Sequence, residues 1–302
     1  MPGDALHPPE ATALDRLRRE RGPDDYLNTL TLDHLAVQAR RPPAPPLTGT
    51  FPVEAQRVLG LKMMEAIGFD FTRGRLDIST HPFCGGADND VRITTRYDEA
   101  DFTSALMGVM HETGHALYEQ GRPQGYLDQP VGQARGMSLH ESQSLLIEMQ
   151  VCRSRAFIGF AAPLLREAFG GEGPFWGPEA LYRHYTRVRP GFIRVDADEV
   201  TYPAHVILRY RLEKALIADE MPLSALPGAW NEGMEALLGI TPPDDRRGCL
   251  QDVHWPSGGW GYFPTYTLGA MTAAQIFDAP EAEYTRSLLA SWPRLRAADG
   301  GV

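Results

Sequence analysis

Hydrophobic residues recur every three or four positions over most of the chain, and this spacing predicts a mainly α-helical protein. The segments with this pattern, taken in order, cover residues 11–21, 25–40, 52–68, 140–160, 178–188, 202–219, 226–238 and 266–277. One further helix is expected between a cap at Asp98 or Asp101 and a stop at Gly121. Residues 41–46 are rich in proline, so we expect a linker or a surface strap there rather than a helix interior.

Two short segments, residues 75–79 and 90–95, alternate between apolar and polar positions and contain β-branched residues. The glycine-containing segment 85–89 lies between them. We therefore expect a small antiparallel sheet whose second strand leads directly into the helix that ends at Gly121.

That helix carries the strongest chemical signal in the chain, the sequence His111-Glu112-Thr113-Gly114-His115. Positions four apart lie on one face of a helix, so His111 and His115 can direct two imidazoles at one metal ion. Glu112 is then placed to reach a water molecule beside that ion, as in the HExxH pattern of zinc hydrolases. The alternative is two ordinary histidines, each hydrogen-bonded within a buried amphipathic helix.

A catalytic zinc ion needs a third protein ligand. A histidine six positions after His115 is excluded because Gly121 stands there. Glu119 lies about 12 Å along the helix from His111, too far for one ion. The ligand must come from another helix, where Glu141 and Glu148 are both candidates. The apolar neighbours of Glu148 favour Glu141, although Glu141 could simply stabilise the start of its helix.

Composition narrows the functional classes. The chain has 302 residues, 43% of them hydrophobic, a net charge of -10 and no basic run, which argues against nucleic-acid binding. Cys84, Cys152 and Cys249 are far apart and odd in number, so we expect free thiols in a reducing compartment. The sequence contains no apolar run of about 20 residues and no basic, apolar leader, so we expect a cytoplasmic protein that does not bind membranes.

Six motifs then carry a family resemblance. They are His81-Pro82-Phe83, Asp90-x-Arg92-x-Thr94, His111-Glu112-x-x-His115, His140-Glu141-Ser142-Gln143, Ile193-Arg194-x-x-Ala197-Asp198 and Gly248-x-x-Gln251-Asp252-x-His254-Trp255. In this order they resemble the motifs of the thermostable M32 metallocarboxypeptidases. The similarity extends from about Pro46 to Phe277, so we expect an N-terminal helical and proline-rich segment (1–45), a catalytic domain (46–277) and a C-terminal tail (278–302).

The resemblance implies a gluzincin-type helical peptidase, with a small sheet beside a deep active-site groove, that removes residues one at a time from peptide C-termini. It implies that His111, His115 and Glu141 bind one metal ion per chain, Zn²⁺ with Co²⁺ as the alternative, and that Glu112 is the general base. The substrates would be peptides with a free C-terminus, and a homodimer is possible. The arginine of the fifth motif, here Arg194, is a proposed anchor for the terminal carboxylate of the substrate.

Other substrate contacts stay open. Arg92 could also bind a carboxylate through two parallel hydrogen bonds, or could instead pair with Asp90 or Asp98. The alternative for Arg194 is a solvated ion pair with the acidic residues that follow it. Tyr202, His205, His254 and Tyr262 are candidate donors to the oxyanion of the reaction.

The chain departs from the resemblance in length, because typical members of the family are much longer on both sides of the motifs. Two alternatives follow. Shortened groove walls would admit longer substrates and make the protein a zinc endopeptidase or oligopeptidase. A protein that has lost catalysis would bind peptides without cleaving them.

Overall fold

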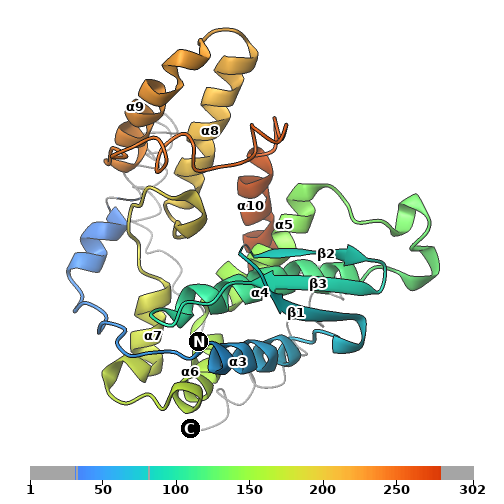
Figure 1. Ribbon diagram of the computed structural model, residues 1–302. Helices are drawn as coiled ribbons and strands as arrows, with labels where there is room; N and C mark the ends of the chain where they lie inside the picture. Colours follow the sequence, from blue (N-terminus) through green and yellow to red (C-terminus); the bar gives the residue numbers. More distant parts are fainter. Residues whose placement is uncertain (1–30, 32, 81, 280–302) are drawn as a thin grey trace. The chain divides into compact units, whose positions relative to one another are not determined.

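The computed structural model describes residues 31, 33–80 and 82–279 (Figure 1). The chain divides into two compact units. Unit 1 contains Met1–Pro43 and Arg187–Pro264, and unit 2 contains Ala44–Thr186 and Thr265–Val302. The predicted helix at 11–21, the first part of the one at 25–40, and His81 lie outside the described residues.

Helix α4 (Phe102–Gln120) forms the centre of unit 2. It begins at Asp101, whose side chain accepts a hydrogen bond from the backbone N–H of Thr103, and it ends at Gly121. Asp101 is one of the two predicted caps, so this helix is confirmed at both ends. An aspartate at the N-cap is favourable because it satisfies a backbone donor that the helix leaves unpaired.

A three-stranded sheet packs on one side of α4 and has the order β1-β3-β2. Its strands are β1 (Gly74–Ile78), β2 (Phe83–Ala87) and β3 (Asp90–Thr95). The predicted antiparallel pairing of residues 75–79 with residues 90–95 is wrong, because β1 runs parallel to β3. The antiparallel partner of β3 is β2, which folds back through a tight turn in which Asn89 has a positive φ of 61°.

The main core of unit 2 lies between α4, α3 (Val53–Ala66), α6 (Arg155–Phe169) and α7 (Pro178–Tyr185). On α3, the residues that face inward include Leu59, Met63 and Met64, whereas Val58 is 41% exposed. These buried residues belong to two clusters, because α3 packs against both α4 and the cluster beneath the sheet.

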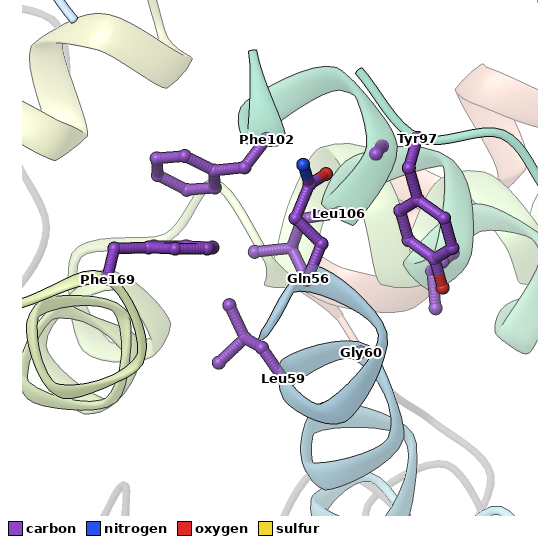
Figure 2. Close-up of a pocket in the computed structure, with 9 residues that line it drawn as sticks. Gln56, Leu59, Gly60, Tyr97, Phe102, Leu106 and Phe169 are labelled. Carbon is purple, nitrogen blue, oxygen red and sulfur yellow. The ribbon is translucent and has the colours of Figure 1, made fainter. Parts of the chain in front are cut away.

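Figure 2 shows a small cavity of about 10 Å³ between α3, α4 and Phe169. Leu59, Phe102 and Leu106 are among the apolar side chains that line it. This space belongs to the packing of the core, since none of the predicted metal ligands lines it.

The predicted helix at 140–160 is wrong as a single element. The chain forms α5 (Met137–Leu145), a π-helical segment η4 (Leu146–Val151), and α6, which begins after Ser154. The Ser154 hydroxyl accepts a hydrogen bond from the N–H of Phe157, which starts a new helix where an unbroken one was expected. The last helix, α10 (Pro264–Asp278), packs Ala273 against the α5–η4 segment.

Unit 1 is built around the helical pair α8 (Tyr202–Ile217) and α9 (Leu226–Leu238). Leu208 and Leu212 of α8 pack against Trp230 and Met234 of α9. The mainly α-helical prediction is therefore confirmed for both units. Among the described residues, no helix combines the length and the apolar character needed to cross a membrane.

Candidate metal centre

Three side chains that can bind a metal ion meet in unit 2. His111 and His115 extend from α4, and Glu141 extends from α5. The Nε2 atom of His111 lies 3.9 Å from one Glu141 carboxylate oxygen, and Nε2 of His115 lies 3.3 Å from the other. Ligands of a tetrahedral zinc ion stand about 3.3 to 3.6 Å apart. The donor set and its spacing therefore fit a zinc ion, with a fourth position left for water or substrate.

Two glycines allow Glu141 to reach this position. A Cβ atom at Gly114 of α4 would stand 2.5 Å from the Gln143 carbonyl oxygen of α5, so the two backbones are in direct contact there. On the opposite side, a Cβ atom at Gly269 of α10 would stand 3.0 Å from both Cβ and Cγ of Glu141. Glu141 is consequently held between two helices and is 5% exposed.

Glu148, the other candidate for the third ligand, contacts a different atom. Its carboxylate lies 2.9 Å from Nδ1 of His111, on the far side of the ring from the ligand set, and 2.7 Å from the Arg153 guanidinium. Burial opposes ionisation, but the hydrogen bond to His111 and the charge of Arg153 lower the pKa of Glu148 to about 2. A carboxylate on the second nitrogen orients a metal-binding histidine and increases its basicity.

His115 has a partner of its own, which the sequence did not predict. Its Nδ1 lies 2.7 Å from Nδ1 of His140, and Nε2 of His140 lies 2.8 Å from Glu119. Burial lowers the pKa of His115, which favours the neutral form that binds metals. The sequence analysis considers Glu119 only as a metal ligand. Its spacing of four residues from His115 indicates that it lies beside His115 on the same face of the helix.

Glu112 lies beside the ligand set and is 8% exposed. Burial raises the pKa of Glu112, and the carboxylates of Glu141 and Glu148 add to this effect, while the charge of His111 opposes it. A carboxylate with increased proton affinity suits a residue that must accept and then release a proton near neutral pH.

The predicted substrate contacts Arg194, Tyr202, His205 and His254 lie in unit 1, where they surround Asp252. The Asp252 carboxylate accepts hydrogen bonds from Arg194 at 2.9 Å and from Arg209 at 2.5 Å. Nη1 of Arg194 donates to the Tyr202 hydroxyl, and Nδ1 of His254 lies 3.7 Å from Asp252. The sequence contained Asp252 in the sixth motif but did not identify it as the partner of Arg194.

This arginine cluster is buried. Arg194 is 5% exposed and Arg209 is fully buried, with its guanidinium 4.5 Å from the centre of the Trp230 ring. Arg194 is therefore buried with Asp252, whereas the alternative considered for it was a pair exposed to solvent. Asp198 instead accepts hydrogen bonds from the backbone of Arg189, Val200 and Thr201. Burial and the two neighbouring arginines lower the pKa of His205 to about 3, so the ring is neutral.

Arg92 is not one of the three residues of the candidate metal centre. It lies on β3, where Val91 and Ile93 on either side of it face the core beneath the sheet, and its own side chain is exposed. Its guanidinium lies 2.7 Å from Asp90. This pairing is the alternative that the sequence analysis considered. A role for Arg92 in binding substrate stays a prediction.

Comparisons of the sequence with a family model and with curated proteins indicate the same family. A family model described as Carboxypeptidase Taq (M32) metallopeptidase matches residues 27–293. The chain is 45% identical over 253 residues to thermostable carboxypeptidase 1 of Thermus thermophilus and 41% identical over 243 residues to carboxypeptidase 1 of Bacillus subtilis. These alignments cover 83% and 80% of this chain, but 49% and 48% of the relatives.

Among solved structures, Trypanosoma cruzi metallocarboxypeptidase 1 is similar with a TM-score of 0.83 and 43% identity. The superposition covers 99% of this chain and 60% of that one. The chain thus spans about half the length of the curated relatives it matches.

Proposed function

The chain belongs to the M32 family of metallopeptidases, and on this premise we propose that it is a zinc-dependent metallocarboxypeptidase that releases single amino acids from peptide C-termini. The observation that carries the proposal is the placement of His111, His115 and Glu141 with their ligand atoms within 4.8 Å of one another. The buried Glu112 beside them supplies the proton-transfer group that peptide hydrolysis needs.

His111 and His115 would hold the metal through Nε2, and Glu141 would hold it through its carboxylate. When bound, a zinc ion supplies a Lewis acid that activates water and polarises the scissile carbonyl group. Cobalt is a second candidate, since the same nitrogen and oxygen donors suit it. One ion per chain is expected, because the described residues contain one group of candidate ligands, His111, His115 and Glu141.

Glu112 would accept a proton from the attacking water and pass it to the nitrogen of the departing amino acid. Its burial supports this role because a carboxylate in a water-poor site has a pKa closer to neutrality. Both transfers use the same carboxylate, so the residue would return to its starting state after each cycle.

Recognition of the free C-terminus is proposed for Arg194. A guanidinium binds a carboxylate in a planar, two-point geometry, and Asp252 holds this one in a single orientation. Tyr202, His205 and His254 lie in the same cluster, and they stay proposed as donors to substrate. Peptides would be the substrates, and a homodimer stays a prediction.

A cytoplasmic location also stays a proposal. Cys84, Cys152 and Cys249 are free thiols in the structure, as the sequence predicted, and free thiols are typical of a reducing compartment.

Paired peptides test the proposed activity. The zinc-loaded protein is incubated with one peptide that has a free C-terminus and with the same peptide amidated, and the products are followed by mass spectrometry. Stepwise loss of residues from the free peptide alone is the expected result. Cleavage of both at internal bonds would show the endopeptidase alternative. Cleavage of neither by a zinc-loaded protein would overturn the proposed activity and favour the alternative of a protein that has lost catalysis.

A further inference from the structure

A chain of polar contacts begins at the metal ligand His115 and leads away from the metal. His115 Nδ1 lies 2.7 Å from His140 Nδ1, and His140 Nε2 lies 2.8 Å from Glu119 Oε1. The second Glu119 oxygen lies 2.7 Å from the Arg122 guanidinium, which also pairs with Asp88 at 2.5 Å. His115 and Glu119 come from α4, and His140 comes from α5.

The positions of the protons along this chain follow from the chemistry of imidazole. To bind a metal through Nε2, His115 must have its lone pair on Nε2 and its proton on Nδ1. That proton points at Nδ1 of His140, which must therefore accept it. His140 then carries its own proton on Nε2, where the Glu119 carboxylate accepts it. Each donor in this arrangement has one acceptor.

The opposite arrangement removes the metal ligand. If His140 donated from Nδ1, then Nδ1 of His115 would have to accept, and the proton of the neutral His115 ring would move to Nε2. A protonated Nε2 has no lone pair for a metal. The acceptor that Glu119 provides at the far end of His140 selects against this arrangement, because it needs the His140 proton on Nε2.

The position of the His140 ring is determined by one face of α4. His115, Tyr118 and Glu119 stand at positions i, i+3 and i+4 and so lie next to one another on the helix surface. The Tyr118 ring meets the His140 ring edge to face at 5.1 Å, and the Tyr118 hydroxyl is itself held by the backbone N–H of Arg135. His140 is adjacent in sequence to Glu141. One turn of α5 therefore carries one proposed ligand, Glu141, and contacts a second, His115, through His140.

We propose that His140 is a positioning residue for the metal site, which holds His115 in the tautomer and orientation that bind the ion, and that Glu119 fixes the tautomer of His140. This inference rests on the proposed function. It assigns a place in the site to a histidine that would not itself bind the metal. Because an outer partner of this kind typically contributes about 10-fold to 100-fold in metal affinity, the effect is measurable.

The experiment measures the zinc dissociation constant of the whole chain by competition with a chelator at constant pH. His140→Leu removes the acceptor, and we expect zinc to bind about 10-fold to 100-fold more weakly. His140→Asn can place an amide oxygen close to the position of Nδ1, so we expect it to recover most of the affinity. The matched control is His184→Leu, a partly buried histidine of unit 2 whose Nε2 contacts the Thr103 hydroxyl, and its zinc affinity should not change.

The outcomes separate this inference from the proposed function. Failure of the unaltered chain to bind zinc at His111, His115 and Glu141 would overturn the metal site itself. Normal zinc affinity in His140→Leu, or equal weakening in His140→Leu and His140→Asn, would overturn the positioning role alone.

If His140→Leu does not fold, the test compares the zinc affinities of Glu119→Leu and Glu119→Gln, because glutamine retains an acceptor for the Nε2 proton of His140. Weaker zinc binding in Glu119→Leu alone is expected, and equal affinity in the two variants would overturn the role.

Discussion

Gly114 of α4 lies directly against Gln143 of α5, with its backbone so close to the Gln143 carbonyl oxygen that a Cβ atom would stand 2.5 Å away. Helix α5 carries Glu141 two residues earlier, so this contact sets the depth at which the third proposed ligand enters the site. The glycine within the HExxH sequence therefore has a packing role that the motif itself does not state.

The first prediction compares the same substitution at two helical glycines. Gly114→Ala should destabilise the protein by about 1 to 3 kcal/mol, because the methyl group forces two backbones apart, and should weaken zinc binding. Gly159→Ala on the exposed side of α6 meets nothing within 4 Å and should stabilise the protein by about 0.4 to 1 kcal/mol. Urea unfolding measures both changes. Equal effects at the two sites would show that the α4–α5 contact is looser than described.

The second prediction concerns the proposed base. Glu112→Gln retains the shape of the side chain but cannot accept a proton, so kcat for a peptide with a free C-terminus should fall by at least about 100-fold. Zinc content, measured by metal analysis, should stay at that of the unaltered chain, because Glu112 is not among the three proposed ligands. Full turnover by the variant would show that another group transfers the proton.

The third prediction concerns the third ligand. Residues that orient a ligand contribute about 10-fold to 100-fold to metal affinity, so loss of a ligand in Glu141→Ala should cost more than about 100-fold. Chelator competition measures this change. Glu167→Ala, at an exposed glutamate of the same unit, provides the control and should bind zinc normally. Retention of stoichiometric zinc by Glu141→Ala would mean that another residue completes the site.

The fourth prediction compares a buried and an exposed ion pair. Asp252→Asn leaves two buried arginines without their counter-charge and should destabilise unit 1 by about 3 to 5 kcal/mol. Asp90→Asn breaks the exposed pair with Arg92, at a similar distance of 2.7 Å, and should change stability much less because solvent screens this pair. Chemical unfolding provides the comparison, and a similar cost for both variants would contradict the buried role of Asp252.

The fifth prediction is a pH dependence of stability. The pKa of His205 in the fold is about 3, below the usual value of about 6.5. Between these values the unfolded chain binds a proton at His205 that the folded chain does not, so stability falls as pH falls, by about 1.4 kcal/mol per pH unit from this residue. Unfolding free energies of the unaltered chain and His205→Gln, measured from pH 7.5 to pH 5, should run parallel above about pH 6.5 and approach this difference in slope below it. Curves that stay parallel over the whole range would mean that His205 is protonated in the fold.

Sequence reasoning predicted the helical class, and it predicted that His111 and His115 share one face of one helix, because their spacing depends on local helix geometry alone. It failed where partners are distant along the chain. Asp252 meets Arg194 across 58 residues, whereas the sequence analysis weighed only the acidic residues immediately after Arg194. No local rule selects one aspartate over another.

The sheet shows a different limit. Alternation marks a strand but does not state which neighbour it pairs with or in which direction. Strand β2 contains two glycines and no β-branched residue, so its sequence resembles a loop. Without β2, the two alternating segments favour an antiparallel pair of β1 and β3, whereas β2 is the antiparallel partner of β3. The unbroken helix expected at 140–160 failed for a related reason, since apolar spacing continues across a π-helix and a new N-cap.

The π-helix η4 has a consequence for the chain lengths that this region can accept. Its hydrogen bonds include one from the N–H of Cys152 to the carbonyl of Ile147, five residues earlier, so the segment holds one residue more than an ordinary turn. Deleting one residue between Glu148 and Arg153 would turn the π turn into an ordinary α turn with little rotation of the chain that follows, because the extra residue is accommodated within the turn. The two side chains would then stand at positions i and i+4, which are neighbours on a helix. Natural variation in this segment should therefore include chains that are one residue shorter.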